Sequence, residues 1–142
     1  MPNRIQRRRT AGWRKPENAV IVSRPSRFGN PCKVALMQEM GYHDPHAAAV
    51  ENFERWLQGS RFGWPTDEGD ARRERILADL PQLRGKDLAC TCRADQTCHA
   101  DVLLRWLALP ERELTGRIAW IRSRVDFQRV ADGYEPLYGG ES

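Results

Sequence analysis

The sequence contains no apolar run approaching the roughly 20 residues that a membrane-spanning helix needs, so we expect no membrane partner. Its basic start is not followed by an apolar stretch, which argues against a secretory signal. Cysteine is scarce, with four residues, and Cys90 and Cys92 are too close in sequence to pair without strain. These absences favour reduced thiols in a cytoplasmic protein over a secreted, disulfide-linked one.

Acidic residues are missing from the first 15 positions, although the whole chain of 142 residues has a net charge of only +4. The basic residues of this segment are Arg4, Arg7, Arg8, Arg9, Arg14 and Lys15. Such an arm suits a phosphate-bearing partner, but a frayed, solvated terminus would have the same composition. We therefore expect a basic N-terminal arm over 1–15, an α/β core over 16–109, and a C-terminal helix with a loose tail over 110–142.

Hydrophobic periodicity and capping residues predict the elements of the core. Two short apolar runs predict buried strands at 19–23 and 88–92, the first of them central or parallel, and residues 1–18 are expected to be irregular. Helices are expected over 32–40, 44–58, 68–80, 100–109 and 111–130, with Asp44 as an N-cap. This order predicts an α/β fold, a small single domain with a short, mostly parallel sheet, flanking helices and a C-terminal helix.

Two unusual segments directly follow the predicted strands. The loop 24–31 leaves the carboxyl end of the first strand, and the cysteine-rich segment 90–99 leaves the carboxyl end of the second. Ligand sites in parallel sheets lie at the carboxyl ends of the strands. We therefore expect both segments to line one pocket.

The cysteine-rich segment holds three of the four cysteines and one of the three histidines. Cys90 and Cys92 would share one face of a strand, and Cys98 and His99 begin the next helix, from which they can fold over that face. Together these four residues suit a tetrahedral zinc site. Two features argue against it: one residue separates Cys90 and Cys92 where zinc ribbons favour two, and adjacent Cys98 and His99 would diverge if both were helical.

A reactive thiol is the second interpretation of this segment, with Cys98, His99 and Asp101 as the candidate catalytic residues. The positive end of the helix dipole would favour the Cys98 thiolate, and His99 would assist it. Asp101 would then support His99, although capping of the helix explains it as well. Simple packing explains a buried Cys90 but not three cysteines together.

The loop 24–31 has the composition of an anion-binding loop. Its candidate ligand-binding residues are Arg24, Ser26, Arg27, Gly29 and Asn30. Guanidinium groups hold phosphate bidentately, and a glycine lets the backbone approach a ligand. Phe28 could stack on a base. The alternative is a rigid proline turn whose arginines pair with acidic residues of the fold.

A second cluster, His43-Asp44-Pro45-His46, has ligand types that suit a metal. The role of Asp44 as a helix N-cap explains most of this cluster. We therefore assign no metal-binding role to its histidines.

The loop Arg-Pro-Ser-Arg-Phe-Gly-Asn-Pro and the segment Leu-Ala-Cys-Thr-Cys, which leads to Cys-His-Ala-Asp-Val-Leu, together resemble a bacterial and phage family known as domain of unknown function 4326. The likeness covers about Gly12 to Ala108, so the basic arm and the last helix lie outside it. Where this chain has Phe28 and Thr91, the family commonly has Trp, which argues against stacking at Thr91. The resemblance implies that the residues of the two segments form one site, and it implies no activity.

These features predict a protein that binds a nucleotide or another phosphate-bearing ligand, with Arg24 and Arg27 on the anion and a Cys/His centre beside it. Zinc is the cofactor expected if a metal is bound. The sequence leaves open whether the chain is an enzyme; if so, transfer or hydrolysis on a nucleotide or nucleic-acid base is the expected class. The alternative function is that of a non-catalytic nucleic-acid-binding module with a structural zinc. A third possibility is an interaction protein whose site is idle. The oligomeric state is not indicated.

Overall fold

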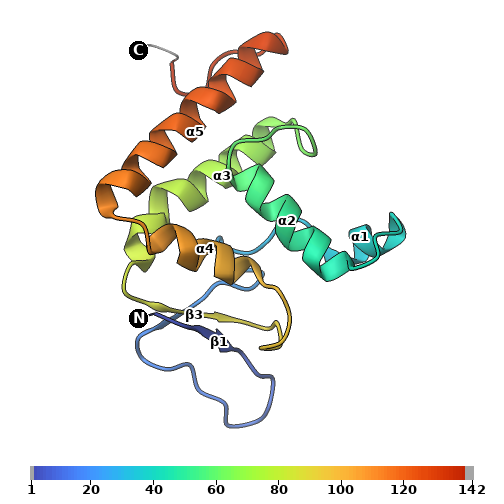
Figure 1. Ribbon diagram of the computed structural model, residues 1–142, viewed down its shortest axis with the longest axis vertical. Helices are drawn as coiled ribbons and strands as arrows, with labels where there is room; N and C mark the ends of the chain where they lie inside the picture. The colour runs from blue at the N-terminus through green and yellow to red at the C-terminus, as the bar shows by residue number, and fades with distance from the viewer. Residues whose placement is uncertain (1, 140–142) are drawn as a thin grey trace.

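The computed structural model describes residues 2–139, and it has the predicted α/β fold with a parallel sheet and a C-terminal helix (Figure 1). In chain order the elements are β1 (Arg4–Gln6), β2 (Ala19–Ile21), α1 (Val34–Glu39), α2 (Pro45–Leu57), α3 (Asp67–Asp79), the short 3₁₀ helix η1 (Leu80–Leu83), β3 (Asp87–Cys90), α4 (His99–Leu107) and α5 (Glu111–Ala131). None of the helices within residues 2–139 is both long and apolar enough to cross a membrane.

The sheet has the strand order β1-β3-β2, and both pairs are parallel. Ala89 of β3 lies opposite Ile5 on one side and Ile21 on the other. The prediction of a parallel strand at Ala19–Ile21 is confirmed, but β2 is an edge strand and β3 is the central one. In this central strand, Leu88 and Ala89 are fully buried.

The expectation that residues 1–18 are irregular is wrong for Arg4–Gln6, which form the edge strand β1. The strand is held by β3 at both ends: Arg7 N donates to Cys90 O at 2.7 Å, and Leu88 N donates to Asn3 O at 3.0 Å. Three residues are too few for a periodic pattern, so the sequence shows no sign of this strand. Part of the predicted basic arm therefore belongs to the sheet, and residues 7–9 leave it at its carboxyl end.

Helices α2, α3 and α4 supply most of the core over the sheet. Side chains that are almost completely buried include Phe53 and Leu57 of α2, Ile76 of α3, and Leu103 and Trp106 of α4. The predicted start of α2 is confirmed, since Asp44 Oδ1 accepts a hydrogen bond from Ala47 N at 3.1 Å. This packing holds the N-terminus of α4 close to the carboxyl end of β3.

Helix α5 packs through Leu114, Ile118, Ile121 and Val125, the face that its periodicity predicts. Within the described part of the tail, residues 137 and 138 are held in place, whereas a loose tail was expected. Asp126 of α5 accepts hydrogen bonds from Leu137 N at 2.6 Å and Tyr138 N at 3.1 Å, and Tyr138 Oη donates to Glu74 of α3 at 2.7 Å. Tyr138 and Glu74 are 64 residues apart, so no local sequence pattern shows this contact. Residues 140–142 lie outside the described residues.

A buried ion cluster joins α5 to the rest of the fold. Asp70 of α3 is completely buried and accepts hydrogen bonds from three buried arginines. They are Arg61 at 3.0 Å, Arg73 at 3.0 Å and Arg129 of α5 at 2.7 Å. We call this group the Asp70 cluster.

Candidate metal centre and cavity

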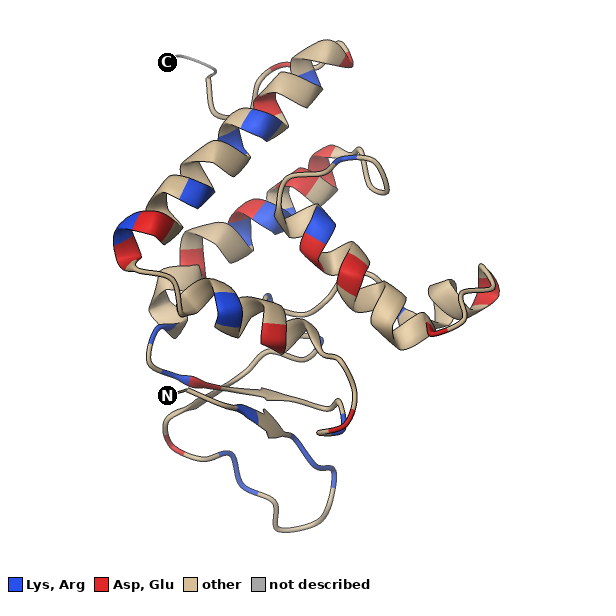
Figure 2. Cartoon of the chain, in the orientation of Figure 1, with Lys and Arg blue, Asp and Glu red and all other residues tan. Residues whose placement is uncertain are grey.

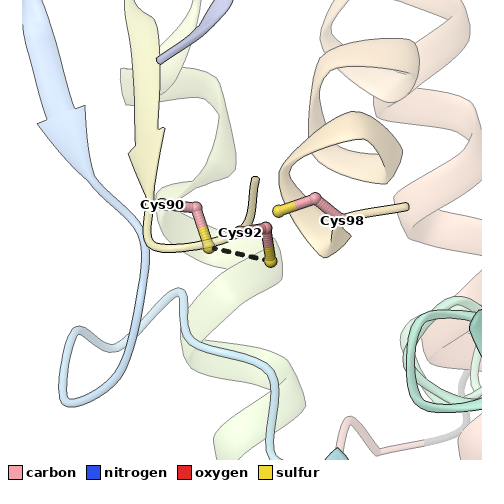
Figure 3. Close-up of side chains that lie close together, drawn as sticks. All are labelled: Cys90, Cys92 and Cys98. Atoms are coloured by element: carbon pink, nitrogen blue, oxygen red, sulfur yellow. Dashed lines mark hydrogen bonds between the residues drawn. The ribbon is translucent and has the colours of Figure 1, made fainter. Parts of the chain in front are cut away.

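The thiols of Cys90, Cys92 and Cys98 gather at the carboxyl end of β3 (Figure 3). All three Sγ atoms lie within 4.8 Å of one another, and those of Cys90 and Cys92 are 3.6 Å apart. With Zn–S bonds of about 2.3 Å, the ligands of a tetrahedral zinc are separated by about 3.8 Å. The three sulfurs therefore have the spacing of ligands to one metal ion.

His99 directs a nitrogen at the same point. Its Nδ1 lies 4.0 Å from Cys90 Sγ and 3.8 Å from Cys98 Sγ, while its Nε2 lies 2.9 Å from Val22 O. A carbonyl only accepts, so Nε2 carries a proton and Nδ1 faces the sulfurs, which is how metal-binding histidines are commonly held. Cys98 has extended backbone (φ −144°, ψ 144°) and only His99 is helical, so the adjacent side chains converge.

The proximity of these groups changes their proton affinities. Hydrogen bonding with Cys92 lowers the pKa of Cys90, and the same interaction raises the pKa of Cys92. Burial lowers the pKa of His99, but hydrogen bonds to Cys90 and Cys98 outweigh burial and raise the pKa to about 10. The buried sulfurs therefore favour a positive charge beside them, which in the absence of metal is the proton on His99. A metal ion bound at this point would release the protons held by the thiols and by His99 Nδ1.

His46, to which the sequence assigned no metal-binding role, lies beside this centre. Its Nε2 is 3.4 Å from Cys92 Sγ, and it comes from the first turn of α2. The His-Asp-Pro-His pattern was the available signal. Asp44 does cap α2, but this role does not explain the position of His46. The packing of α2 beside the cysteines brings His46 close to Cys92.

A cavity of about 220 Å³ opens beside the centre. Its lining includes Arg24, Asn30, His46, Cys90, Cys92 and His99. The loop 24–31 and the cysteine-rich segment therefore meet in one cavity. The fourth cysteine, Cys32, also lines it, and burial raises the pKa of its thiol.

Not all of the predicted ligand-binding residues reach this cavity. Arg24 and Asn30 line it, whereas Ser26, Arg27 and Gly29 do not. Arg27 pairs with Asp79 at 2.8 Å, but no acidic side chain within residues 2–139 pairs with Arg24. Arg24 is therefore the cation of this loop that is available to a ligand.

The other loop residues support its shape. Ser26 Oγ accepts a hydrogen bond from Phe28 N at 3.2 Å, and Asn30 Nδ2 donates to Ala49 O at 3.1 Å. A Cβ on Gly29 would lie 2.8 Å from Arg24 Cγ, so glycine is what allows the loop to fold tightly against Arg24. Phe28 is buried in the core, so the expectation that it stacks on a base is wrong.

Comparison with protein families identifies the chain. Residues 5–109 match the family described as a domain of unknown function (DUF4326). The chain belongs to the DUF4326 family. The match confirms the resemblance and begins in β1, so the family's domain includes this strand, while α5 lies beyond it. Searches of the curated proteins and of the solved structures gave no match.

Asp101 of this DUF4326 chain faces Arg4 rather than His99. Arg4 Nε lies 3.5 Å from Asp101 Oδ1, and Arg4 Nη2 donates to the carbonyls of Arg93 and Ala94 at 3.3 and 2.9 Å. Burial lowers the pKa of Arg4, but hydrogen bonding to Cys98 and the charge of Asp101 raise it above its ordinary value. Arg4 thus holds the cysteine loop in place. This role of Arg4 was not predicted, because its partners lie more than 80 residues away in the sequence.

Proposed function

We propose that this DUF4326 domain binds zinc through Cys90, Cys92, Cys98 and His99, next to a cavity for a phosphate-bearing, nucleotide-like ligand. The observation that supports it best is the convergence of three Sγ atoms within 4.8 Å, with His99 Nδ1 close to two of them. Three thiolates and an imidazole are a typical zinc ligand set. Four such ligands would close the coordination shell, as in structural zinc sites.

The ligand class follows from Arg24 and from the size of the cavity. Arg24 has no acidic partner among the described residues, and guanidinium groups bind phosphate bidentately. The volume of about 220 Å³ is below the roughly 300–1,000 Å³ of pockets that enclose a drug-sized molecule. The cavity therefore suits a small anion or one part of a larger ligand. Four free thiols are consistent with a reducing compartment, so we place the protein in the cytoplasm.

A non-catalytic nucleic-acid-binding module with a structural zinc is the second candidate. It is favoured by Arg7, Arg8 and Arg9, which leave the sheet at the edge where the cysteines lie. The arginines of α5 are less available for this purpose, since Arg122 pairs with Glu74 and Arg129 belongs to the Asp70 cluster.

The metal content of the purified chain tests the proposal. Protein prepared without chelator or nickel affinity is expected to contain about one zinc per chain by elemental analysis. Cys90→Ser should lose the zinc, because the thiolate at the end of β3 is removed. Cys32→Ser is the matched control and should keep it, because this thiol lines the same cavity but lies outside the three-sulfur group.

An absence of metal from the wild-type chain would overturn the zinc centre. If one thiol then alkylated unusually fast at neutral pH, the site would be a reactive cysteine instead.

A further inference from the structure

The carboxyl ends of the three strands place cationic residues on both sides of the cysteine centre. β1 leads into Arg7–Arg9, β3 leads into Thr91 and Cys92, and β2 leads to Arg24. Because the strands are parallel and adjacent strands lie about 4.8 Å apart, the ends of β1 and β2 are separated by about 10 Å across β3. Across the carboxyl end of the sheet, the order is therefore Arg7–Arg9, the three cysteines, and Arg24.

A second, shallower cavity of about 450 Å³ lies on the β1 side. It is lined by Gln6, Arg7, Arg8, Arg9, Thr10 and Thr91. Thr91 lines both cavities, which makes them neighbours on one surface. Figure 2 shows the basic positions along the loop that follows β1.

The arginines of this second cavity are available to a ligand. Arg8 and Arg9 are exposed, and neither forms an ion pair within the described part of the chain. Arg7 is half-buried and donates to Ser23 Oγ at 3.4 Å, and Ser23 lines the first cavity. Arg7 thus connects the two cavities, while Arg8 and Arg9 extend the positive surface outward.

We propose that the ligand is a single strand of nucleic acid that runs along this edge. Its phosphates would bind Arg7–Arg9 on one side and Arg24 on the other, with one nucleotide over the cysteine cavity. A mononucleotide has phosphate on one side of its sugar and base, whereas a strand has phosphate on both. The inference rests on the phosphate-binding part of the proposed function and names its ligand.

The dimensions of the first cavity favour a single strand over a duplex. The cavity of about 220 Å³ admits only part of a nucleotide-sized ligand, and in a duplex the bases are held in the stack. Phe28 is buried and Thr91 has no ring, so the rings that line the two cavities are the imidazoles of His46 and His99, both of which face the cysteines. Binding is therefore mostly electrostatic, independent of base sequence and strongly dependent on salt.

Fluorescence anisotropy with a labelled 12-nucleotide strand of mixed sequence, measured over a series of salt concentrations, tests this inference. DNA and RNA versions are both used. The logarithm of the binding constant falls as the logarithm of the salt concentration rises. Each phosphate contact that is removed makes this negative slope less steep by about 0.7. The double variant Arg8→Ala/Arg9→Ala should make the slope less steep by about 1.4, and Arg24→Ala should make it less steep by about 0.7. In both variants the affinity at low salt should fall roughly tenfold or more. Arg112→Ala, an exposed arginine at the start of α5, should change neither.

Three results would overturn the inference: an unchanged slope in the Arg8/Arg9 variant, equally tight binding of the matching duplex, or displacement of the strand by AMP at comparable concentration. The zinc content of the same preparations separates the two proposals. Zinc present without strand binding removes only the nucleic-acid inference. Strand binding with the expected variant pattern but without zinc removes only the metal centre.

Discussion

At the scale of single residues, His99 connects the fold to the site. Its Nε2 contacts Val22 O at the end of β2, and its Nδ1 faces Cys90 at the end of β3 and Cys98 before α4. One side chain thus ties two strand ends to the start of a helix. The orientation of this proposed zinc ligand is set by the same hydrogen bond that fastens the helix to the sheet.

Asp70 is the residue whose loss should affect stability most. Asp70→Ala is expected to lower the free energy of unfolding by about 3–5 kcal/mol, because it leaves buried guanidinium groups without their common carboxylate. Urea denaturation followed by circular dichroism measures the change. Asp95→Ala, which removes an exposed ion pair with Arg93, is the control and should change little. Wild-type stability of Asp70→Ala would show that the Asp70 cluster does not hold α5 to the core.

At the scale of secondary-structure elements, local signals account for some elements and not for others. Helix α2 was predictable because Asp44 caps it and because Phe53, Trp56 and Leu57 recur at helical spacing. Strand β1 was not, because it is three residues long and its hydrogen bonds go to β3, more than 80 residues away. The stabilising partner of a short strand is not part of its own sequence pattern.

Removal of β1 should therefore destabilise the whole domain. Deletion of residues 2–10 is expected to lower the melting temperature by roughly 10 °C or more, since it leaves β3 with one partner and exposes its edge. Thermal unfolding by circular dichroism measures this shift. Arg8→Ala/Arg9→Ala keeps the strand and should melt within a few degrees of the wild type. If the deletion melted as the wild type does, residues 2–10 would be a free arm after all.

At the scale of the whole molecule, two groups of side chains hold distant parts of the chain together. The cysteine centre joins the carboxyl end of β3 to the start of α4, and the Asp70 cluster joins α3 to α5. The cysteine centre comes from the single segment 90–99 and reaches β2 through the contact of His99 with Val22 O, whereas the Asp70 cluster joins residues 61–73 to Arg129. The proposed zinc would therefore support the sheet end of the molecule, while ion pairs support the end where α5 packs.

Removal of zinc should lower the stability of the domain. Binding to the folded chain alone stabilises it by about 4 kcal/mol when free metal is 1,000 times the dissociation constant, so chelation should lower the melting temperature by about 10 °C. Differential scanning calorimetry before chelation, after it, and after zinc is restored measures the effect and its reversal. Cys90→Ser should melt like the chelated wild type and should not respond to chelator. An unchanged melting temperature after the metal is shown to be gone would mean that zinc does not support the fold.

The sequence by itself determined the fold class, the helices, and the meeting of the loop 24–31 with the cysteine-rich segment. Periodicity and caps are local signals, and the carboxyl ends of parallel strands meet at one end of the sheet wherever the strands lie in the sequence. Only the tertiary structure decided which members of each segment reach the cavity. Arg24 lines it and Arg27 turns to Asp79, and His46 approaches Cys92 because α2 packs beside the sheet edge. The direction of a side chain depends on partners that folding brings from elsewhere in the chain, and no local pattern contains them.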